Sequence, residues 1–210
     1  MNADGQGRLL LVRHTESIWN KENLFTGWVD IPLSDKGKAD AFAVGQALKG
    51  KLEVDKGYTS GLLRAQQTLQ LIIDGGELGD IPIVEDWHLN ERFYGNWQGK
   101  NKKQTADKYG DDAVQSVRRG YANRPPGGES LEDTTERVLP YFDEVIDPEV
   151  AEGKTLLIAA HGNSLRALVK RLDGLSDEVV PGVEIANGEV IRYKRNADGS
   201  YTRETDAADV

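Results

Sequence analysis

The chain alternates between short apolar runs and segments whose apolar residues recur at helical spacing. Arg8–Val12 and Thr155–Ala160 are apolar runs of strand length, as expected of strands buried on both faces of a parallel sheet. Weaker strand patterns lie at Gly57–Ser60 and Ile81–Val84. Helical spacing marks four further segments: the one that Ser34 begins and that runs to about Leu48, Leu62–Ile73 with Gly75 and Gly76 as its stop, Glu129 to about Ile146 with a kink at Pro140, and Asn163–Leu172. This alternation predicts an α/β fold of three layers, with helices on both faces of a mostly parallel central sheet.

The segment from about residue 85 to 128 differs from the rest because it is aromatic and charged. It predicts two helices, Asn101–Tyr109 and Asp112–Ala122, in an insertion that walls a site. No internal repeat or long linker interrupts the chain, so we expect one domain over residues 1–210 with this insertion above the active site.

The last fifty residues carry a turn signal and an acidic end. Asn187-Gly188 lies between Val183–Ile185 and Val190–Lys194, a pattern that predicts a hairpin. The acidic segment Glu204–Val210 is expected to fray.

Charge and composition exclude several classes of protein. The 210 residues include 26 Lys and Arg against 35 Asp and Glu, a formal charge of −9, which argues against nucleic-acid or anionic-membrane partners. The absence of cysteine excludes disulfides, thiolate metal sites and cysteine nucleophiles. The first residues are polar and include Asp4, unlike a signal peptide, and the run Leu156–Ala160 is too short for a membrane helix. We therefore expect a cytoplasmic protein.

Two of the three histidines stand directly after the two strongest strand patterns. His14 follows Val12-Arg13, and His161 follows Ala159-Ala160. Ligands of open α/β sheets bind beyond the carboxyl ends of the strands, so neighbouring strands would bring both imidazoles into one site. His88 has no such context and is interpreted as structural.

Arginines gather around the same strand ends. Arg13 follows an apolar strand, where an unpaired charge is costly without an anion. Arg64 follows the second strand, and Arg118 and Arg119 form a pair within the insertion. A guanidinium offers a planar fork that suits phosphate and carboxylate oxygens, so the pattern predicts a local anion site in an acidic protein.

Five sequence blocks, in collinear order between about Leu9 and Tyr193, carry a resemblance to a known family. They are Leu10–Asn20, Asn23–Trp28 with Leu33–Gly37, Tyr58–Ala65, Leu89–Gly95 and Ala160–Val169. Together they resemble the cofactor-dependent phosphoglycerate mutases of the histidine phosphatase superfamily, in a short form.

The resemblance implies a reaction and a role for each matching residue. His14 would carry phosphate as a phosphohistidine, His161 would stabilise the phosphoryl oxygens, and Glu91 would be the general acid and base. The activity implied is the interconversion of 3-phosphoglycerate and 2-phosphoglycerate, primed by 2,3-bisphosphoglycerate and needing no metal. The positions implied for substrate binding are Arg13, Ser17, Asn20, Thr26, Gly27, Arg64, Arg92, Tyr94, Lys102, Arg118, Arg119, Gly162 and Asn163.

Departures from the family pattern keep other interpretations open. Thr15 stands where these mutases usually carry glycine, and the chain passes from Arg119 to Glu129 without the lid-like insertion of longer forms. A barer site favours the alternative of a histidine phosphatase that hydrolyses small phosphoesters. A phospholigand-binding protein without turnover is a second alternative. The subunit number, monomer or homodimer, is left open.

Overall fold

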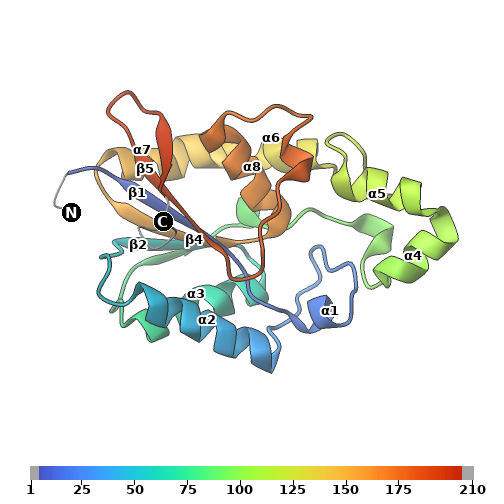
Figure 1. Cartoon of the computed structure of the whole chain (residues 1–210), viewed down its shortest axis with the longest axis horizontal. Coiled ribbons are helices and arrows are strands. Elements are labelled where there is room, and N and C mark those ends of the chain that lie inside the picture. Colours follow the sequence, from blue (N-terminus) through green and yellow to red (C-terminus); the bar gives the residue numbers. More distant parts are fainter. Residues whose placement is uncertain (1–4, 205–210) are drawn as a thin grey trace, which may run out of the picture.

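A mixed sheet of six strands forms the centre of the computed structural model, which describes residues 5–204 (Figure 1). The strand order is β3-β2-β4-β1-β5-β6, in which β3, β2, β4 and β1 pair in parallel, β5 is antiparallel to β1, and β6 is antiparallel to β5. The strands are β1 Arg8–Arg13, β2 Lys56–Thr59, β3 Ile83–Glu85, β4 Thr155–Ala160, β5 Val190–Arg195 and β6 Tyr201–Glu204. The predicted α/β class with a mostly parallel sheet is confirmed.

Helices cover both faces of this sheet. One face packs against α2 and α3, and the other against α6, α8 and the segment between α6 and β4 (Figure 1). The α-helices are α1 Ile18–Lys21, α2 Asp35–Leu48, α3 Leu63–Gly76, α4 Lys102–Tyr109, α5 Asp111–Arg119, α6 Leu131–Tyr141, α7 Asp147–Ala151 and α8 Gly162–Asp173. Short 3-10 turns are η1 Trp87–Leu89, η2 Gly95–Trp97 and η4 Val180–Gly182, and a π-helical segment, η3 Phe142–Ile146, joins α6 to α7.

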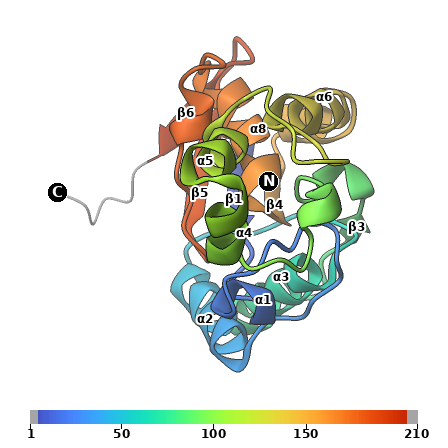
Figure 2. The ribbon, with the colours of Figure 1, turned by 90° about the vertical axis from the view of Figure 1, so that its right-hand side faces the viewer.

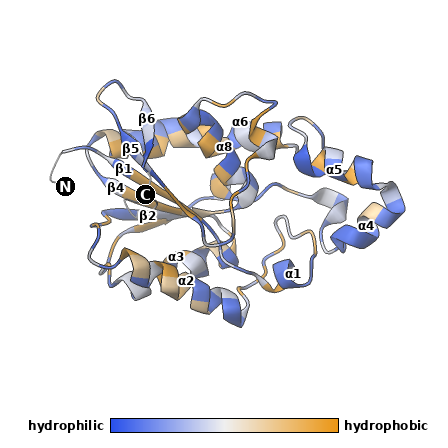
Figure 3. Cartoon of the chain, viewed as in Figure 1, coloured by the Kyte–Doolittle hydropathy of each residue, from blue (hydrophilic) through white to orange (hydrophobic). Residues whose placement is uncertain are grey.

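Side chains of the central strands pack alternately into two separate hydrophobic cores, one on each face of the sheet. Leu9 and Leu11 of β1 pack toward α6 and α8, whereas Leu10 and Val12 pack toward α2 and α3. Because successive strand residues point to opposite faces, a strand covered on both sides reads as an unbroken apolar run. Figure 3 shows this apolar centre between two helical layers with polar outer surfaces.

The carboxyl ends of β1 and β4 lie side by side. The two strands pair in parallel, with Arg13 opposite Ala160, so the residues that follow them share one edge of the sheet. The helices α1, α4 and α5 lie beyond this edge, at the end of the molecule that faces the viewer in Figure 2. The sheet therefore brings His14 and His161 together.

The predicted hairpin around Asn187-Gly188 is wrong. Val183–Ile185 forms no strand, and β5 instead pairs with β1 and with β6, a strand that the sequence pattern did not predict. The carbonyls of Val183 and Ile185 accept hydrogen bonds from the side chains of Arg166 and Arg13 instead of a neighbouring strand.

The end of one helix also differs from expectation. Gly75 and Gly76 do not stop α3 but form its last turn, and the left-handed residue that ends the helix is Glu77, with φ of 50°. Both glycines lie against α2 across a tight contact, since a β-carbon on Gly75 would lie 2.2 Å from the carbonyl oxygen of Phe42. The prediction for residues 205–210 lies outside the described residues. No helix within residues 5–204 is long and apolar enough to cross a membrane.

Candidate active site

A cavity of about 70 Å³ opens beyond the carboxyl ends of β1 and β2. Its lining comes from β1 and the loop after it, from the start of α3, and from the insertion that begins near residue 85. The lining residues are Arg13, His14, Asn20, Leu24, Phe25, Thr26, Gly27, Arg64, Glu91, Tyr94 and Lys102. Most were predicted from the family resemblance, whereas Leu24 and Phe25 were not.

His14 is held in one tautomer. Its Nδ1 lies 2.7 Å from the carbonyl oxygen of Thr15, and because a carbonyl only accepts, Nδ1 carries the hydrogen and Nε2 carries the lone pair. Burial, followed by the charges of Arg64 and Arg13, holds the pKa of His14 well below its usual value. The imidazole is therefore neutral at physiological pH and offers Nε2 as a nucleophile.

His161 stands across from His14, with the ring centres 5.0 Å apart and the planes tilted by 59°. It is fully buried at the N-terminus of α8, and burial with the charge of Arg64 holds its pKa well below the usual value. Ser60 Oγ lies 2.7 Å from its Nε2. Ser60 ends the predicted strand Gly57–Ser60, but the sequence analysis assigned it no role, since only the fold brings it to His161.

Two arginines, the buried Arg64 and the partly buried Arg13, supply positive charge to the cavity. Arg64 donates to the carbonyls of Gly27 at 2.8 Å and Val29 at 3.1 Å, and Arg13 donates to the carbonyl of Ile185 at 2.7 Å. Burial lowers the pKa of Arg64 to about 10, so the guanidinium stays charged at neutral pH. The Nε atoms of both arginines are buried without a hydrogen-bond partner within residues 5–204, which leaves donors for an anion.

Glu91 is a buried carboxylate with three donors on one oxygen. Its Oε1 accepts from the backbone N–H of Arg92 at 2.8 Å, and from the backbone N–H and side-chain amide of Asn163 at 3.1 and 2.8 Å. Burial raises the pKa of Glu91, but these hydrogen bonds and the charges of Arg13 and Arg64 outweigh it and leave the pKa below the usual value. The group is therefore ionised at neutral pH and can accept a proton.

Three polar residues of the insertion, Arg92, Tyr94 and Lys102, lie at or next to the cavity wall. Arg92 donates to Tyr94 Oη at 3.0 Å and to the carbonyl of Val117 in α5 at 2.9 Å, so it ties the site to the insertion. Burial and the charge of Arg118 hold the pKa of Lys102 below its usual value, although the nearby Tyr94 opposes them. Lys102 thus adds a cation at the cavity wall.

The remaining predicted residues lie around the cavity instead of lining it. Ser17 is buried and caps α1, where its hydroxyl donates to Asn20 Oδ1 at 2.9 Å and so orients Asn20. Arg118 shares a neighbouring groove with Lys102. Arg119 lies in a further hollow, paired with Glu184 at 2.6 Å. A β-carbon on Gly162 would lie 3.6 Å from Arg13 Nε, so Gly162, like Asn163, lies against the cavity residues.

Thr15, the residue that departs from the family pattern, turns its side chain away from the cavity. Its hydroxyl donates to the carbonyl of Gly37 at 2.8 Å, and its backbone N–H donates to Thr68 Oγ1 at 3.2 Å. Its φ is not positive, so the backbone here needs no glycine. Threonine at this position is therefore not among the residues that line the cavity, and it ties the loop to α2 and α3.

Comparisons with known proteins agree with this geometry. The model of the histidine phosphatase superfamily, branch 1, matches residues 9–206. The chain is 48% identical to 2,3-bisphosphoglycerate-dependent phosphoglycerate mutase 2 of Gloeobacter violaceus, over 93% of this chain and 89% of that protein. It is 50% identical to the 2,3-bisphosphoglycerate-dependent phosphoglycerate mutase of Parvibaculum lavamentivorans, over 93% of each chain.

A solved structure shares the fold at lower identity. The mycobacterial glucosyl-3-phosphoglycerate phosphatase in complex with VO3 superposes with a TM-score of 0.83 at 24% identity, covering 95% of this chain and 98% of that one. The chain belongs to the histidine phosphatase superfamily and, within it, to the family of 2,3-bisphosphoglycerate-dependent phosphoglycerate mutases.

Proposed function

We propose that this chain interconverts 3-phosphoglycerate and 2-phosphoglycerate through a phosphohistidine at His14. The observation that carries the proposal is the pairing, in one cationic cavity, of a neutral imidazole with a separate ionised carboxylate. His14 offers Nε2, while Glu91 supplies a proton acceptor from a different loop. A transfer between two hydroxyls of one substrate needs both groups, because a proton must leave one hydroxyl and return to the other.

The first half of the reaction starts from the phosphorylated enzyme. The free hydroxyl of 3-phosphoglycerate attacks the phosphorus on His14, the N–P bond breaks, and Glu91 takes the hydroxyl proton. A carboxyl with a lowered pKa is already ionised for this step. Arg13 and Arg64 then hold the phosphoryl oxygens as charge moves between donor and acceptor.

The second half reverses the roles of the same groups. His14 Nε2 attacks the other phosphate, and the protonated Glu91 returns its proton to the departing oxygen. His14 regains its phosphoryl group and the product keeps one phosphate, so atoms and protons balance. The hydrogen bond from Nδ1 to the carbonyl of Thr15 keeps Nε2 as the attacking atom in every cycle.

The cavity residues fit 2,3-bisphosphoglycerate as the primer. The Nε donors of Arg13 and Arg64, which have no hydrogen-bond partner among residues 5–204, and the partly buried Lys102 would hold its anionic groups. When bound, the primer supplies the phosphoryl group that first loads His14. The same arginines suit the single phosphate and carboxylate of the phosphoglycerates, which makes small anions the partners of this site.

Hydrolysis of small phosphoesters is the competing function. Phosphatases and mutases of this superfamily differ in whether water or a second hydroxyl accepts the phosphoryl group. The two mutases named above are 48% and 50% identical to this chain, against 24% for the phosphatase, which favours the mutase.

The assay that separates the two functions starts from 3-phosphoglycerate, with and without a catalytic amount of 2,3-bisphosphoglycerate. We expect 2-phosphoglycerate to form at a rate that the bisphosphate stimulates, with little inorganic phosphate. Release of inorganic phosphate without isomerisation contradicts the proposal and selects the phosphatase. A His14→Ala variant serves as the blank, since it removes the phosphoryl acceptor.

A further inference from the structure

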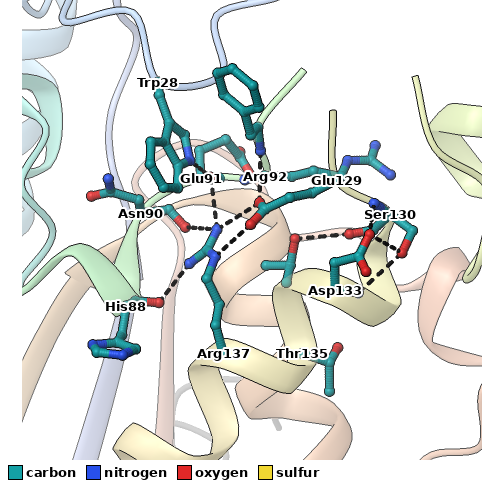
Figure 4. A network of polar contacts seen from close by, with 12 residues as sticks. Trp28, His88, Asn90, Glu91, Arg92, Glu129, Ser130, Asp133, Thr135 and Arg137 are labelled. Carbon is teal, nitrogen blue, oxygen red and sulfur yellow. Dashed lines mark hydrogen bonds and ion pairs between the residues drawn. The ribbon is translucent and has the colours of Figure 1, made fainter. Parts of the chain in front are cut away.

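Arg137 of α6 is a partly buried arginine whose side chain donates hydrogen bonds to the main chain next to the site. Its Nη1 donates to the carbonyl of His88 at 2.7 Å, and its Nη2 donates to the carbonyls of Asn90 at 3.0 Å and Glu91 at 2.9 Å (Figure 4). The guanidinium also pairs with Glu129, with Nε 2.9 Å from Oε1 and Nη2 3.0 Å from Oε2. The side chain of Arg137 is only 9% exposed.

Glu129 adds a hydrogen bond to the main chain on the C-terminal side of Glu91. Its Oε2 also accepts the backbone N–H of Phe93 at 2.8 Å. The Arg137–Glu129 pair therefore holds carbonyls before and at Glu91 and an N–H two residues after it (Figure 4). Trp28 adds a hydrogen bond from Nε1 to the Glu91 carbonyl, and its ring lies 5.6 Å from the guanidinium.

The segment around Glu91 depends on these side-chain hydrogen bonds because it has no regular secondary structure. Residues 90–94 lie between two 3-10 turns, η1 and η2, and belong to no strand or helix. In a strand, backbone hydrogen bonds to the neighbouring strand fix the position of each residue. Here, the side chains of Arg137 in α6 and of Glu129, just before α6, make the hydrogen bonds instead. The Glu91 carboxylate must nevertheless meet donors on α8, so its backbone must keep a fixed place relative to both helices.

We propose that Arg137, together with Glu129, positions Glu91 for proton transfer; this inference rests on the proposed function. Among the hydrogen bonds of residues 5–204, the pair reaches one lining residue of the cavity, Glu91, and it does so through the main-chain carbonyl. An arginine is required because a planar fork reaches several carbonyls and a carboxylate at once, whereas a lysine ammonium is a single point. A displacement of about 1 Å in a catalytic group can cost about 100-fold in rate.

The test uses Arg137→Lys, which keeps the charge and removes the fork. We expect kcat for isomerisation to fall by about 10- to 100-fold with KM for 3-phosphoglycerate nearly unchanged, because Glu91 acts on the proton and not on binding. Arg195→Lys is the matched control. Arg195 also makes two hydrogen bonds to one carboxylate, that of Asp147, but at the opposite end of the sheet. The kcat of the Arg195→Lys variant is therefore expected to match that of the wild type.

The decisive readout is the same substitution in a Glu91→Gln background. If Arg137 acts through Glu91, Arg137→Lys lowers kcat in the wild type but causes little further loss once the carboxylate is gone. A loss of equal factor in both backgrounds, or a loss shared by Arg195→Lys, overturns the proposal and leaves a purely structural role. Glu129→Gln, expected to act in the same direction with a smaller loss, provides a second variant should Arg137→Lys fold poorly.

The outcome remains readable if the proposed function itself fails. The same proteins are assayed for phosphate release from 3-phosphoglycerate. A wild type that only hydrolyses this substrate rejects the mutase. The coupling between Arg137 and Glu91 is then measured on hydrolysis, which also needs a proton for the departing oxygen.

Discussion

The two buried histidines make the stability of this protein depend on pH in a specific way. His14 and His161 are 3% and 0% exposed, and burial, with the charge of Arg64, holds the pKa of each well below 6.5. In the unfolded chain both imidazoles regain a pKa near 6.5. Below that pH the unfolded state binds more protons than the folded state, so the free energy of unfolding falls as the pH drops.

The unfolded state sets the upper limit of the effect. Between pH 7.5 and 5.5, an imidazole that titrates near 6.5 when unfolded and stays neutral when folded removes about 1 kcal/mol of stability, or slightly more. His14 and His161 together therefore remove at most about 3 kcal/mol over this interval.

The assay is urea unfolding at both pH values in a buffer without phosphate, since an anion in the cavity favours protonated imidazoles. The reference is the double variant His14→Asn and His161→Gln. The first change keeps a nitrogen donor near the carbonyl of Thr15, and the second keeps a polar atom near Ser60. His88 is present in both proteins and therefore does not distinguish them. We expect the wild type to lose about 2 to 3 kcal/mol more than the variant on acidification.

Equal losses in the two proteins would refute the reasoning. They would mean that the folded imidazoles take up protons as freely as the unfolded ones. His14 would then be largely protonated at mildly acidic pH, and the neutral nucleophile assigned to the site would lose its physical basis.

Three substitutions test separate parts of the site. Glu91→Gln keeps an oxygen for the three donors on Oε1 and removes the proton acceptor, so kcat for isomerisation is expected to fall by about 100- to 10,000-fold with the fold intact, as measured by steady-state kinetics and circular dichroism. Lys102→Met removes a cation from the cavity wall and is expected to raise KM for 3-phosphoglycerate by about 10-fold or more; an unchanged KM contradicts its role in binding. Thr15→Gly loses the hydrogen bond to the carbonyl of Gly37 and is expected to lower the free energy of unfolding by about 1–3 kcal/mol, without changing the ratio of isomerisation to phosphate release. A shift of that ratio toward the mutase would instead mean that threonine favours hydrolysis.

The sheet edge that holds the histidines could be predicted from sequence because its signals are local. Continuous apolar runs identify strands buried on both faces, and His14 and His161 follow the two clearest runs directly. The geometry of parallel strands then brings their carboxyl ends together without knowledge of any side-chain contact.

Glu91 illustrates where local signals end. By its own context it is an ordinary surface glutamate, and only the family resemblance marks it. Its environment depends on Asn163, which lies 72 positions away, and on Arg137, which reaches its carbonyl from α6. Such long-range contacts produce no periodic pattern in the sequence. The spacing of apolar residues around Arg137 therefore predicts the helix but not the hydrogen bonds that Arg137 makes to the segment around Glu91.

The segment around Asn187 shows a local signal that tertiary contacts override. Asn-Gly between apolar residues is a strong hairpin pattern, and a tight turn does form there, with φ of 77° at Gly188. The turn and the residues before it contact the candidate site instead: the Asn187 side chain donates to the carbonyl of His14 at 2.7 Å, and the carbonyl of Ile185 accepts a hydrogen bond from Arg13. These contacts with residues far away in the sequence replace the predicted strand pairing, and no local pattern encodes them.

The claim that His14 carries the phosphoryl group is tested most directly by labelling. The protein is incubated with radiolabelled 2,3-bisphosphoglycerate, quenched at alkaline pH, and digested to locate the label. We predict label on the peptide that contains His14, lost on chase with unlabelled 3-phosphoglycerate and recovered in phosphoglycerates. Label on another residue, or label that leaves only as inorganic phosphate, would contradict the account.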